Sequence, residues 1–109
     1  MCREYLGQQL TVKVDRPVGI NHKGIKYELN YGYIPGTMAP DGEELDAYLL
    51  GAHKPLIEAT GICIAFIHRY DDDDDKLIVS LDGTNYSDAE IEKAVYFQEQ
   101  YFSHCIIRE

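Results

Sequence analysis

The first half of the chain alternates between apolar and polar residues in short stretches. In residues 10–16, LTVKVDR, the alternation predicts a half-buried strand that ends at Pro17. The tyrosine-rich residues 27–34 and the stretch LDAYLL at 45–50 predict two more strands, each followed by a turn signal. Residues 18–26 contain two glycines and mixed polarity, so we expect a loop or turn there.

The longest apolar run, GICIAFIHRY at residues 61–70, predicts a strand buried on both faces. Strict alternation would place on one face Ile62, Ile64 and Phe66, and on the other Cys63, Ala65 and Ile67. The stretch KLIVSL at 76–81 is the expected hairpin partner of this strand, and residues 105–109 predict a short terminal strand.

The last long element is predicted to be a helix. Ser87 and Glu90 match a capping box, in which each side chain satisfies a backbone N–H group at the start of a helix. Helical spacing then relates Ile91, Ala94, Val95, Gln98 and Phe102. Five or six short strands and one C-terminal helix predict a mainly β fold, a small closed or partly closed barrel, as a single domain over residues 1–109.

Composition narrows the classes of partner. The 109 residues carry a formal net charge of −9, which argues against attraction to nucleic acid or to an anionic membrane. No stretch approaches the roughly 20 apolar residues of a membrane span, and residues 1–10 lack the apolar core of a signal peptide. The three cysteines have no metal-ligand spacing and are expected to be reduced thiols. We therefore expect a cytoplasmic protein that binds neither nucleic acid nor membranes.

Carboxylates crowd the stretch PDGEELDAYLLG at residues 40–51, where they are Asp41, Glu43, Glu44 and Asp46. Like charges this close repel, so the stretch is either a solvated turn or a site for a cation. Carboxylates without histidine or cysteine partners suit hard cations such as Mg²⁺ or Mn²⁺. We call residues 41–46 the acidic turn.

A second acidic segment, Asp71 to Asp75, lies between two predicted strands. A solvated hairpin loop would account for it. If this segment and the acidic turn met at one edge of the barrel, they would hold more than one divalent cation, and paired cations activate water for attack on phosphorus. The whole hypothesis of a metal-dependent site therefore requires that the two segments meet.

Residues 30–51, NYGYIPGTMAPDGEELDAYLLG, resemble the signature region of the soluble family I inorganic pyrophosphatases. That family has a tyrosine-rich strand ending in N-Y-G-[FY]-I-P, a turn, and a D-x-D-x-hydrophobic-D motif before an apolar strand. The motif falls here on Asp41, Glu43 and Asp46. The stretch DDDDDKLIV is similar to a later family segment in which aspartates and a lysine precede a strand, and Tyr101 is similar to a tyrosine of the terminal helix.

The resemblance extends from about Val14 to Tyr101 and implies an OB-like five-stranded β-barrel with one C-terminal helix. It implies hydrolysis of pyrophosphate to two phosphates with Mg²⁺, or Mn²⁺, as cofactor. The implied metal ligands are Asp41, Asp46 and one or two of Asp71, Asp72 and Asp74. The implied catalytic carboxylates are Glu43 and Asp46. The implied phosphate ligands are Arg16, Tyr31, Lys76 and Tyr101.

The chain is shorter than usual members, and part of the difference falls near the N-terminus. In the family a strand glutamate and a K-x-E hairpin precede the tyrosine strand. Two placements are open: either Asp15 and Arg16 correspond to the family's D-R pair and the hairpin is absent, or Asp15 replaces the strand glutamate and HKGIKYE is a shortened hairpin with Lys26 and Glu28. We favour the first, because a strand, a short loop and a tyrosine follow in the right order.

Two further departures bear on function. Glu43 stands where the family has the aspartate that accepts the nucleophile's proton, and the extra methylene moves the carboxylate by about an ångström. Phe102 stands where the family has a lysine. The alternatives to a pyrophosphatase are a hydrolase of another small phosphate compound and a non-catalytic relative that binds metal and phosphate. A chain this small is also expected to form a homo-oligomer.

Overall fold

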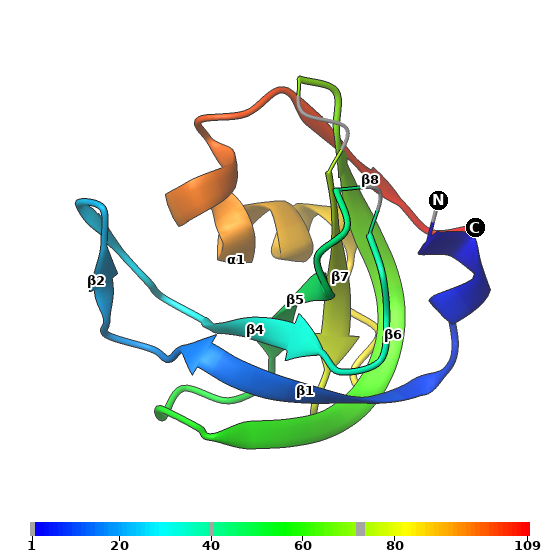
Figure 1. Ribbon diagram of the computed structural model, residues 1–109, viewed down its shortest axis with the longest axis horizontal. Helices are drawn as coiled ribbons and strands as arrows, with labels where there is room; N and C mark the ends of the chain where they lie inside the picture. The colour runs from blue at the N-terminus through cyan, green and yellow to red at the C-terminus, as the bar shows by residue number, and fades with distance from the viewer. Residues whose placement is uncertain (1, 40, 72–73) are drawn as a thin grey trace.

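The computed structural model describes residues 2–39, 41–71 and 74–109, and contains a closed sheet with one helix packed against it (Figure 1). The elements in chain order are the 3-10 helix Cys2–Tyr5, β1 (Gln9–Arg16), β2 (Asn21–His22), β3 (Ile25–Lys26), β4 (Asn30–Ile34), β5 (Leu45–Leu50), β6 (Glu58–Arg69), β7 (Asp75–Ser80), α1 (Asp88–Glu99) and β8 (His104–Ile107). The mainly β fold with one C-terminal helix, predicted from the sequence, is confirmed.

The barrel closes through β6, which curves along one side of the ring in Figure 1. The strand order is β1-β4-β5-β7-β6-β8, and β1 also pairs with β6, so that β1, β4, β5, β7 and β6 form a ring of five. β5 and β7 run parallel, whereas β6 pairs antiparallel with β1, β7 and β8. β8 therefore extends the sheet beyond the ring.

Strands β5 and β7 are buried on both faces, and so is β6 from Cys63 to Arg69, as the apolar run predicted for that strand, whereas Thr60 and Ile62 of β6 are exposed. The ring is filled by apolar side chains that include Val12, Ile34, Leu49, Cys63, Phe66, Leu77 and Val79. A second apolar cluster lies between the outer face of these strands and α1 and includes Tyr48, Ala65, Ile67, Ile78, Ile91 and Val95. The helix thus covers sheet residues that would otherwise face solvent.

β6 departs from strict alternation near its middle. Its pairing with β7 shifts register between Cys63 and Ala65. Phe66 consequently packs with Cys63 inside the ring, whereas Ala65 and Ile67 pack under α1. The predicted faces of this strand are wrong beyond the bulge, because one extra residue in a paired strand reverses the alternation that follows it.

Residues 21–26 form a small hairpin, not the loop predicted from their composition. β2 pairs with β3, and the turn between them is Lys23-Gly24, with φ values of 53° and 84°. Positive φ at both central residues is what the favoured two-residue hairpin turn requires. A hairpin at this point of the chain agrees with the placement in which HKGIKYE is a shortened hairpin.

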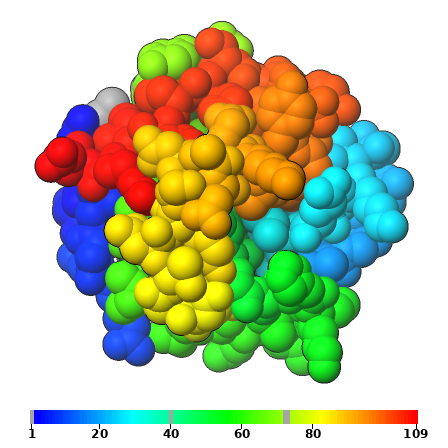
Figure 2. Space-filling view, turned by 180° about the vertical axis from the view of Figure 1, so that it is seen from behind, coloured from blue at the N-terminus to red at the C-terminus, as the bar shows by residue number. Residues whose placement is uncertain are grey.

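The 3-10 helix Cys2–Tyr5 and the residues after β8 lie side by side (Figures 1 and 2). The side-chain Nε of Arg3 donates a hydrogen bond of 3.0 Å to the backbone carbonyl of Glu109. This contact joins the residues after β8 to the 3-10 helix.

α1 begins with the predicted capping box, formed by Ser87 and Glu90. The helix ends at Glu99, so Phe102, which was expected on it, follows it. No helix among the described residues is long and apolar enough to cross a membrane.

His104 of β8 joins the sheet to α1. Its Nδ1 lies 2.8 Å from the carbonyl oxygen of Phe102 and its Nε2 lies 2.8 Å from the carboxylate of Glu92. Because both partners are acceptors, the protonated ring satisfies both. Burial lowers the pKa of His104, but the hydrogen bonds to Phe102 and Glu92 outweigh it, so the pKa lies above its ordinary value of 6.5.

Gly32 of β4 is where β1 comes closest. A Cβ atom there would lie 1.9 Å from the carbonyl oxygen of Lys13, so we expect Gly32→Ala to lower the free energy of unfolding by about 3 kcal/mol or more. Urea unfolding measures this loss. In the control, Gly83→Ala, the new Cβ meets open space. The expected loss of unfolding free energy is about 1 kcal/mol, because alanine is strained at a φ of 78°. Equal losses would contradict the close approach of β1 and β4.

The raised pKa of His104 predicts a pH dependence of stability. A group whose pKa is higher in the folded state contributes stability fully below its unfolded pKa and loses that contribution as the pH rises through the folded pKa. We expect His104→Gln to be less stable than the wild type below pH 6.5, with a difference that shrinks as the pH rises through the folded pKa. Urea titrations of both proteins across this range measure the difference, and a difference that does not change with pH would refute the assignment.

Candidate active site

Two pockets of opposite charge share one wall. The acidic pocket has a volume of about 310 Å³ and is lined by Asp15, Tyr33, Asp41, Glu43, Glu44 and Asp46. The cationic pocket has a volume of about 300 Å³ and is lined by Arg16, His22, Lys23, Ile25, Tyr31, Asp46, Arg69, Lys76, Gln98 and Phe102. Asp46 belongs to both. A larger hollow of about 510 Å³ between α1 and residues 50–53 carries no comparable separation of charge.

Strand pairing places the shared wall. Tyr33 of β4 lies opposite Asp46 of β5, and Asp46 lies beside Lys76 of β7. Paired residues on neighbouring strands project to the same face of a sheet. Asp46 is two residues from Tyr48, whose ring belongs to the cluster under α1. The site therefore lies on the outer face next to the helix, since the ring interior is filled.

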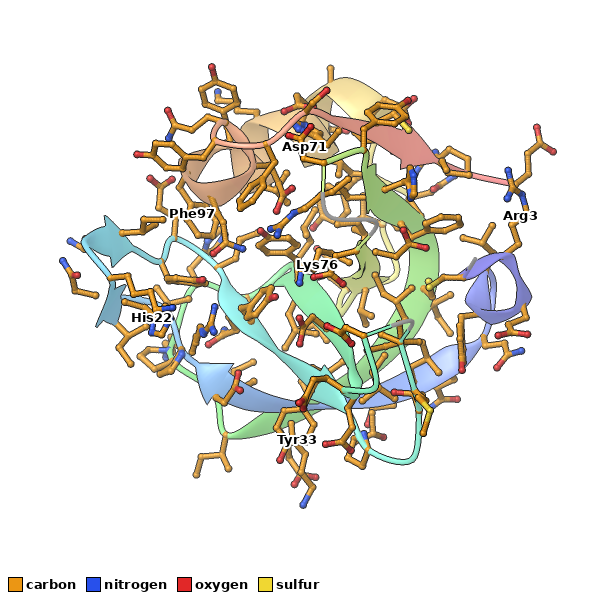
Figure 3. All side chains as sticks on the ribbon, turned by 45° about the horizontal axis from the view of Figure 1, so that its top comes forward. Arg3, His22, Tyr33, Asp71, Lys76 and Phe97 are labelled. Atoms are coloured by element: carbon orange, nitrogen blue, oxygen red, sulfur yellow. The ribbon has the colours of Figure 1, made fainter. Side chains whose placement is uncertain are left out.

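Lys76 joins the two acidic segments. Its Nζ donates hydrogen bonds of 2.7 Å to Asp46 and of 2.7 Å to Asp74, and the residue is only 4% exposed. Asp46 belongs to the acidic turn and Asp74 to the second acidic segment, so the two segments meet at one ammonium group. Figure 3 shows Lys76 near the middle of this face, between Tyr33 and the turn that carries Asp71.

The other described aspartates of the second segment point elsewhere. Asp71 is exposed, and its carboxylate accepts a backbone hydrogen bond away from both pockets. Asp75 is buried and pairs with a histidine on β6. Asp72, which was predicted as a metal ligand, lies outside the described residues. Of the described aspartates in this segment, the structure brings Asp74 to the shared wall.

The acidic turn is shaped by its own backbone. Asp41 Oδ1 accepts a hydrogen bond of 2.9 Å from the backbone N–H of Glu43, and Gly42 has a φ of 85°. Both features are typical of a tight Asx turn, in which glycine adopts the left-handed conformation without strain. The side chains of Asp41, Glu43 and Glu44 are left exposed at the pocket.

The donor set of the acidic pocket fits a hard divalent cation, because it consists of carboxylate oxygens. Within the described part of the chain, no three histidine, cysteine or acidic side chains gather closely enough to hold one metal ion. At the shared wall, the ammonium of Lys76 is the positive charge between Asp46 and Asp74. The chemistry of the residues therefore fits a metal, while the described side chains are arranged around a lysine.

Three of the four predicted phosphate ligands line the cationic pocket: Arg16, Tyr31 and Lys76. Arg16 donates a hydrogen bond of 2.8 Å to the hydroxyl of Tyr27, and its guanidinium lies 5.2 Å from the ring centre of Tyr31. Burial, followed by the charge of Asp46, raises the pKa of Tyr31 well above its ordinary value. Its hydroxyl therefore remains a proton donor at neutral pH.

The fourth predicted phosphate ligand, Tyr101, is not brought to the pocket. Its side chain is 64% exposed and lines neither pocket. The neighbouring Phe102 lines the cationic pocket instead, because the chain turns after α1 ends at Glu99.

Each of the two placements of the N-terminal segment explains part of the geometry. Asp15 lines the acidic pocket, which agrees with its replacing the strand glutamate. Arg16 lines the cationic pocket, as the other placement requires of it. Lys26 and Glu28, the remnant K-x-E pair, are exposed and line neither pocket, whereas Lys23 of the hairpin turn lines the cationic one.

Arg69 and Glu99 also belong to the site, although no motif in the sequence marked them. Arg69, at the end of β6, donates two hydrogen bonds to the carboxylate of Glu99 at the end of α1, of 3.0 Å from Nε and 2.6 Å from Nη2. The hydroxyl of Tyr48 donates to the same carboxylate at 2.6 Å. Burial raises the pKa of Glu99, but the hydrogen bonds from Arg69 and Tyr48 outweigh it, so the pKa is lowered and Glu99 is charged. The signal in the sequence was that Glu99 follows the apolar Val95 by four residues, which places an acid on the buried face of the helix.

Hydrogen bonds continue from this pair across the floor of the pocket. Gln98 Nε2 donates to the hydroxyl of Tyr48 at 2.6 Å, and the hydroxyl of Tyr27 donates to Gln98 Oε1. Tyr27 in turn accepts from Arg16. The two arginines of the pocket are thus tied together through residues of α1.

Comparison with known proteins identifies the family. A model of the inorganic pyrophosphatase family matches residues 4–104. The inorganic pyrophosphatase of Sulfolobus acidocaldarius is 30% identical over 114 aligned residues, covering 90% of this chain and 64% of the relative. The inorganic pyrophosphatase of Saccharolobus solfataricus is 33% identical over 79 residues, covering 69% of this chain and 44% of the relative. This chain thus spans less than two thirds of the length of either relative.

Solved structures agree on the fold. The inorganic pyrophosphatase of Ehrlichia chaffeensis superposes with a TM-score of 0.70 at 16% identity, covering 91% of this chain and 84% of that one. The enzyme of Neisseria gonorrhoeae gives a TM-score of 0.65 at 23% identity, covering 87% and 74%. With the family match over residues 4–104, these findings show that the chain belongs to the inorganic pyrophosphatase family.

Proposed function

We propose that the protein hydrolyses inorganic pyrophosphate to two phosphates, with Mg²⁺ as cofactor and Mn²⁺ as an alternative. The observation that supports this most is the shared wall at Asp46, where a carboxylate-lined pocket adjoins a pocket lined by arginine and lysine. A polyanion needs cations on more than one side, and a site with both a metal pocket and a basic pocket provides them.

The carboxylates that would hold the metal are Asp41 and Asp46 of the acidic turn and Asp74 of the second segment. Asp71 and Asp72 stay candidate ligands on the family resemblance alone, since Asp71 lines neither pocket and Asp72 lies outside the described residues. When bound, the divalent cation supplies positive charge that favours the ionised form of water and offsets the charge of pyrophosphate. Carboxylates in a turn and at a strand start suit this role because their backbone is fixed by pairing and turn hydrogen bonds.

The side chains of this protein would bind and orient the substrate. Arg16, Tyr31 and Lys76 would donate hydrogen bonds to phosphate oxygens, where negative charge is spread in the transition state. Glu43 would accept the proton of the attacking water, with Asp46 beside it. Because Lys76 is held by two aspartates, its ammonium is already aimed at the shared wall.

A second candidate is a non-catalytic relative that binds metal and phosphate. The apolar ring of Phe102 in the pocket wall favours it, because the family resemblance implies a lysine there. Calorimetry distinguishes the two: binding of Mg²⁺ and phosphate without turnover would favour the second candidate. We also propose that the protein is a cytoplasmic homo-oligomer. Another small phosphate compound is the alternative to pyrophosphate as its substrate.

Asp46→Asn tests the shared wall. Asparagine keeps the size of the side chain and can still accept a hydrogen bond from Lys76, but it removes the charge common to both pockets. We expect phosphate release from pyrophosphate with Mg²⁺ to fall by at least about a hundredfold. Asp88→Asn, an exposed acid far along the chain on α1, is the control and should keep the wild-type rate. Equal rates in the two variants would exclude the proposed role of Asp46.

Glu43→Asp tests the extra methylene. Glu43 is proposed to accept the proton of the attacking water, with its carboxylate about an ångström too far forward. Shortening the side chain by one methylene should then raise kcat, by up to about a hundredfold. The same change at the exposed Glu58 on β6 is the control and should leave kcat unchanged. A lower kcat in Glu43→Asp than in the wild type would show that the site is adapted to glutamate.

A further inference from the structure

Arg69 is a cation of the pocket that the family resemblance did not point to. It ends β6, is 5% exposed and lines the cationic pocket beside Arg16, Lys23 and Lys76. Its guanidinium carbon lies 3.7 Å from the ring centre of Phe102, which lines the same pocket. A cation thus sits directly over the apolar ring in the pocket wall.

The orientation of this guanidinium is fixed on two sides. Glu99, which is fully buried, accepts two hydrogen bonds from it, and the ring of Phe102 packs against it. Glu99 is itself held by the hydroxyl of Tyr48. A planar, paired arginine loses little further conformational freedom when an anion binds, and it matches the geometry of phosphate oxygens.

The charges around the pocket favour a ligand role over a purely structural one. A buried ion pair is by itself weak grounds for stability, because desolvation of the two charges offsets their attraction. Four positive side chains line a pocket of about 300 Å³, and the three carboxylates that pair with them, Asp46, Asp74 and Glu99, leave an excess of positive charge. This excess favours the binding of an anion.

We propose that Arg69 binds a phosphate group of the substrate in the cationic pocket, and that Glu99 is its positioning residue. This inference rests on the proposed function, because it names a further substrate contact of the same site. Phe102 then serves as the apolar surface against which the guanidinium packs. The family resemblance implies a lysine at the position of Phe102, in the segment that follows α1. In this chain, Arg69 of β6 supplies the positive charge on that side of the pocket.

The test uses variants that separate charge from folding. Arg69→Met alone would leave Glu99 charged and buried, which is strongly destabilising. The double variant Arg69→Met with Glu99→Gln removes both charges and keeps similar side-chain volumes. Arg69→Lys keeps a cation beside Glu99. The control removes a more exposed arginine–aspartate pair outside both pockets, through Arg108→Met with Asp88→Asn.

The probe is methylenediphosphonate, a pyrophosphate analogue that cannot be hydrolysed, titrated by calorimetry with Mg²⁺ present. We expect the double variant at Arg69 and Glu99 to raise the Kd of the analogue by about ten- to a hundredfold. Arg69→Lys should raise the Kd less, and the control pair should leave it unchanged. Thermal unfolding of each variant is measured alongside. A double variant that melts lower but binds with the wild-type Kd would assign Arg69 a structural role and overturn the inference.

Phosphate release by the wild type separates this inference from the proposed function. A wild type that binds the analogue through Arg69 but releases no phosphate supports the inference and refutes hydrolysis. A wild type that hydrolyses pyrophosphate, with a double variant of unchanged KM, supports hydrolysis and overturns the inference. A wild type that binds no analogue overturns the inference as well.

Discussion

The parallel pairing of β5 with β7 is the constraint on which the site depends. It places Asp46 beside Lys76, and the residue two positions before Lys76, Asp74, then reaches the same ammonium. Without this pairing, the acidic turn and the second acidic segment would be two unrelated loops. A one-residue slip would turn Lys76 into the apolar interior of the ring, which is filled by Leu77 and Val79. Packing of the core and placement of the charges are therefore fixed together.

Helix α1 contributes the other half of the arrangement. Its apolar residues cover the outer face of β5, β6 and β7, and its last turn carries Gln98 and Glu99 under the cationic pocket. The buried polar groups of this turn satisfy one another through Tyr27 and Tyr48, so the helix end cannot shift without breaking several hydrogen bonds. The pocket thus has a rigid floor, although one side of it is formed by the small β2–β3 hairpin.

Local patterns made much of the fold predictable. Alternation located β1 and β4, an apolar stretch closed by a turn signal located β5, the long apolar run located β6, and the capping box located α1. The bulge at Cys63–Ala65 was not predictable, because alternation carries a signal only while the register is unbroken. The hairpin at residues 21–26 was expected only in the less favoured placement, because each of its strands has two residues, too few for any period to show.

The site was predictable only as far as a motif or a charge cluster marked it. Asp41, Asp46, Arg16, Tyr31 and Lys76 were found in this way, and the structure brings them to two adjoining pockets. Arg69 and Glu99 were not, because each looks like the charged end of an apolar element and their sequence separation hides the pairing. Tyr101 was chosen by resemblance alone, and its place depends on how the chain leaves α1, which no local pattern determines.

The adjoining pockets also explain how a chain with a net charge of −9 can be suited to an anion. The long-range field of such a chain repels a polyanion, but beyond about 8 Å at physiological ionic strength that repulsion is largely screened. At contact range, Arg16, Lys23, Arg69 and Lys76 outnumber the acid that shares their pocket. Under the proposed function, metal cations bound in the acidic pocket would make the local charge positive on that side of Asp46 as well. The overall charge would then slow the approach of the substrate, while the two pockets would determine whether it stays.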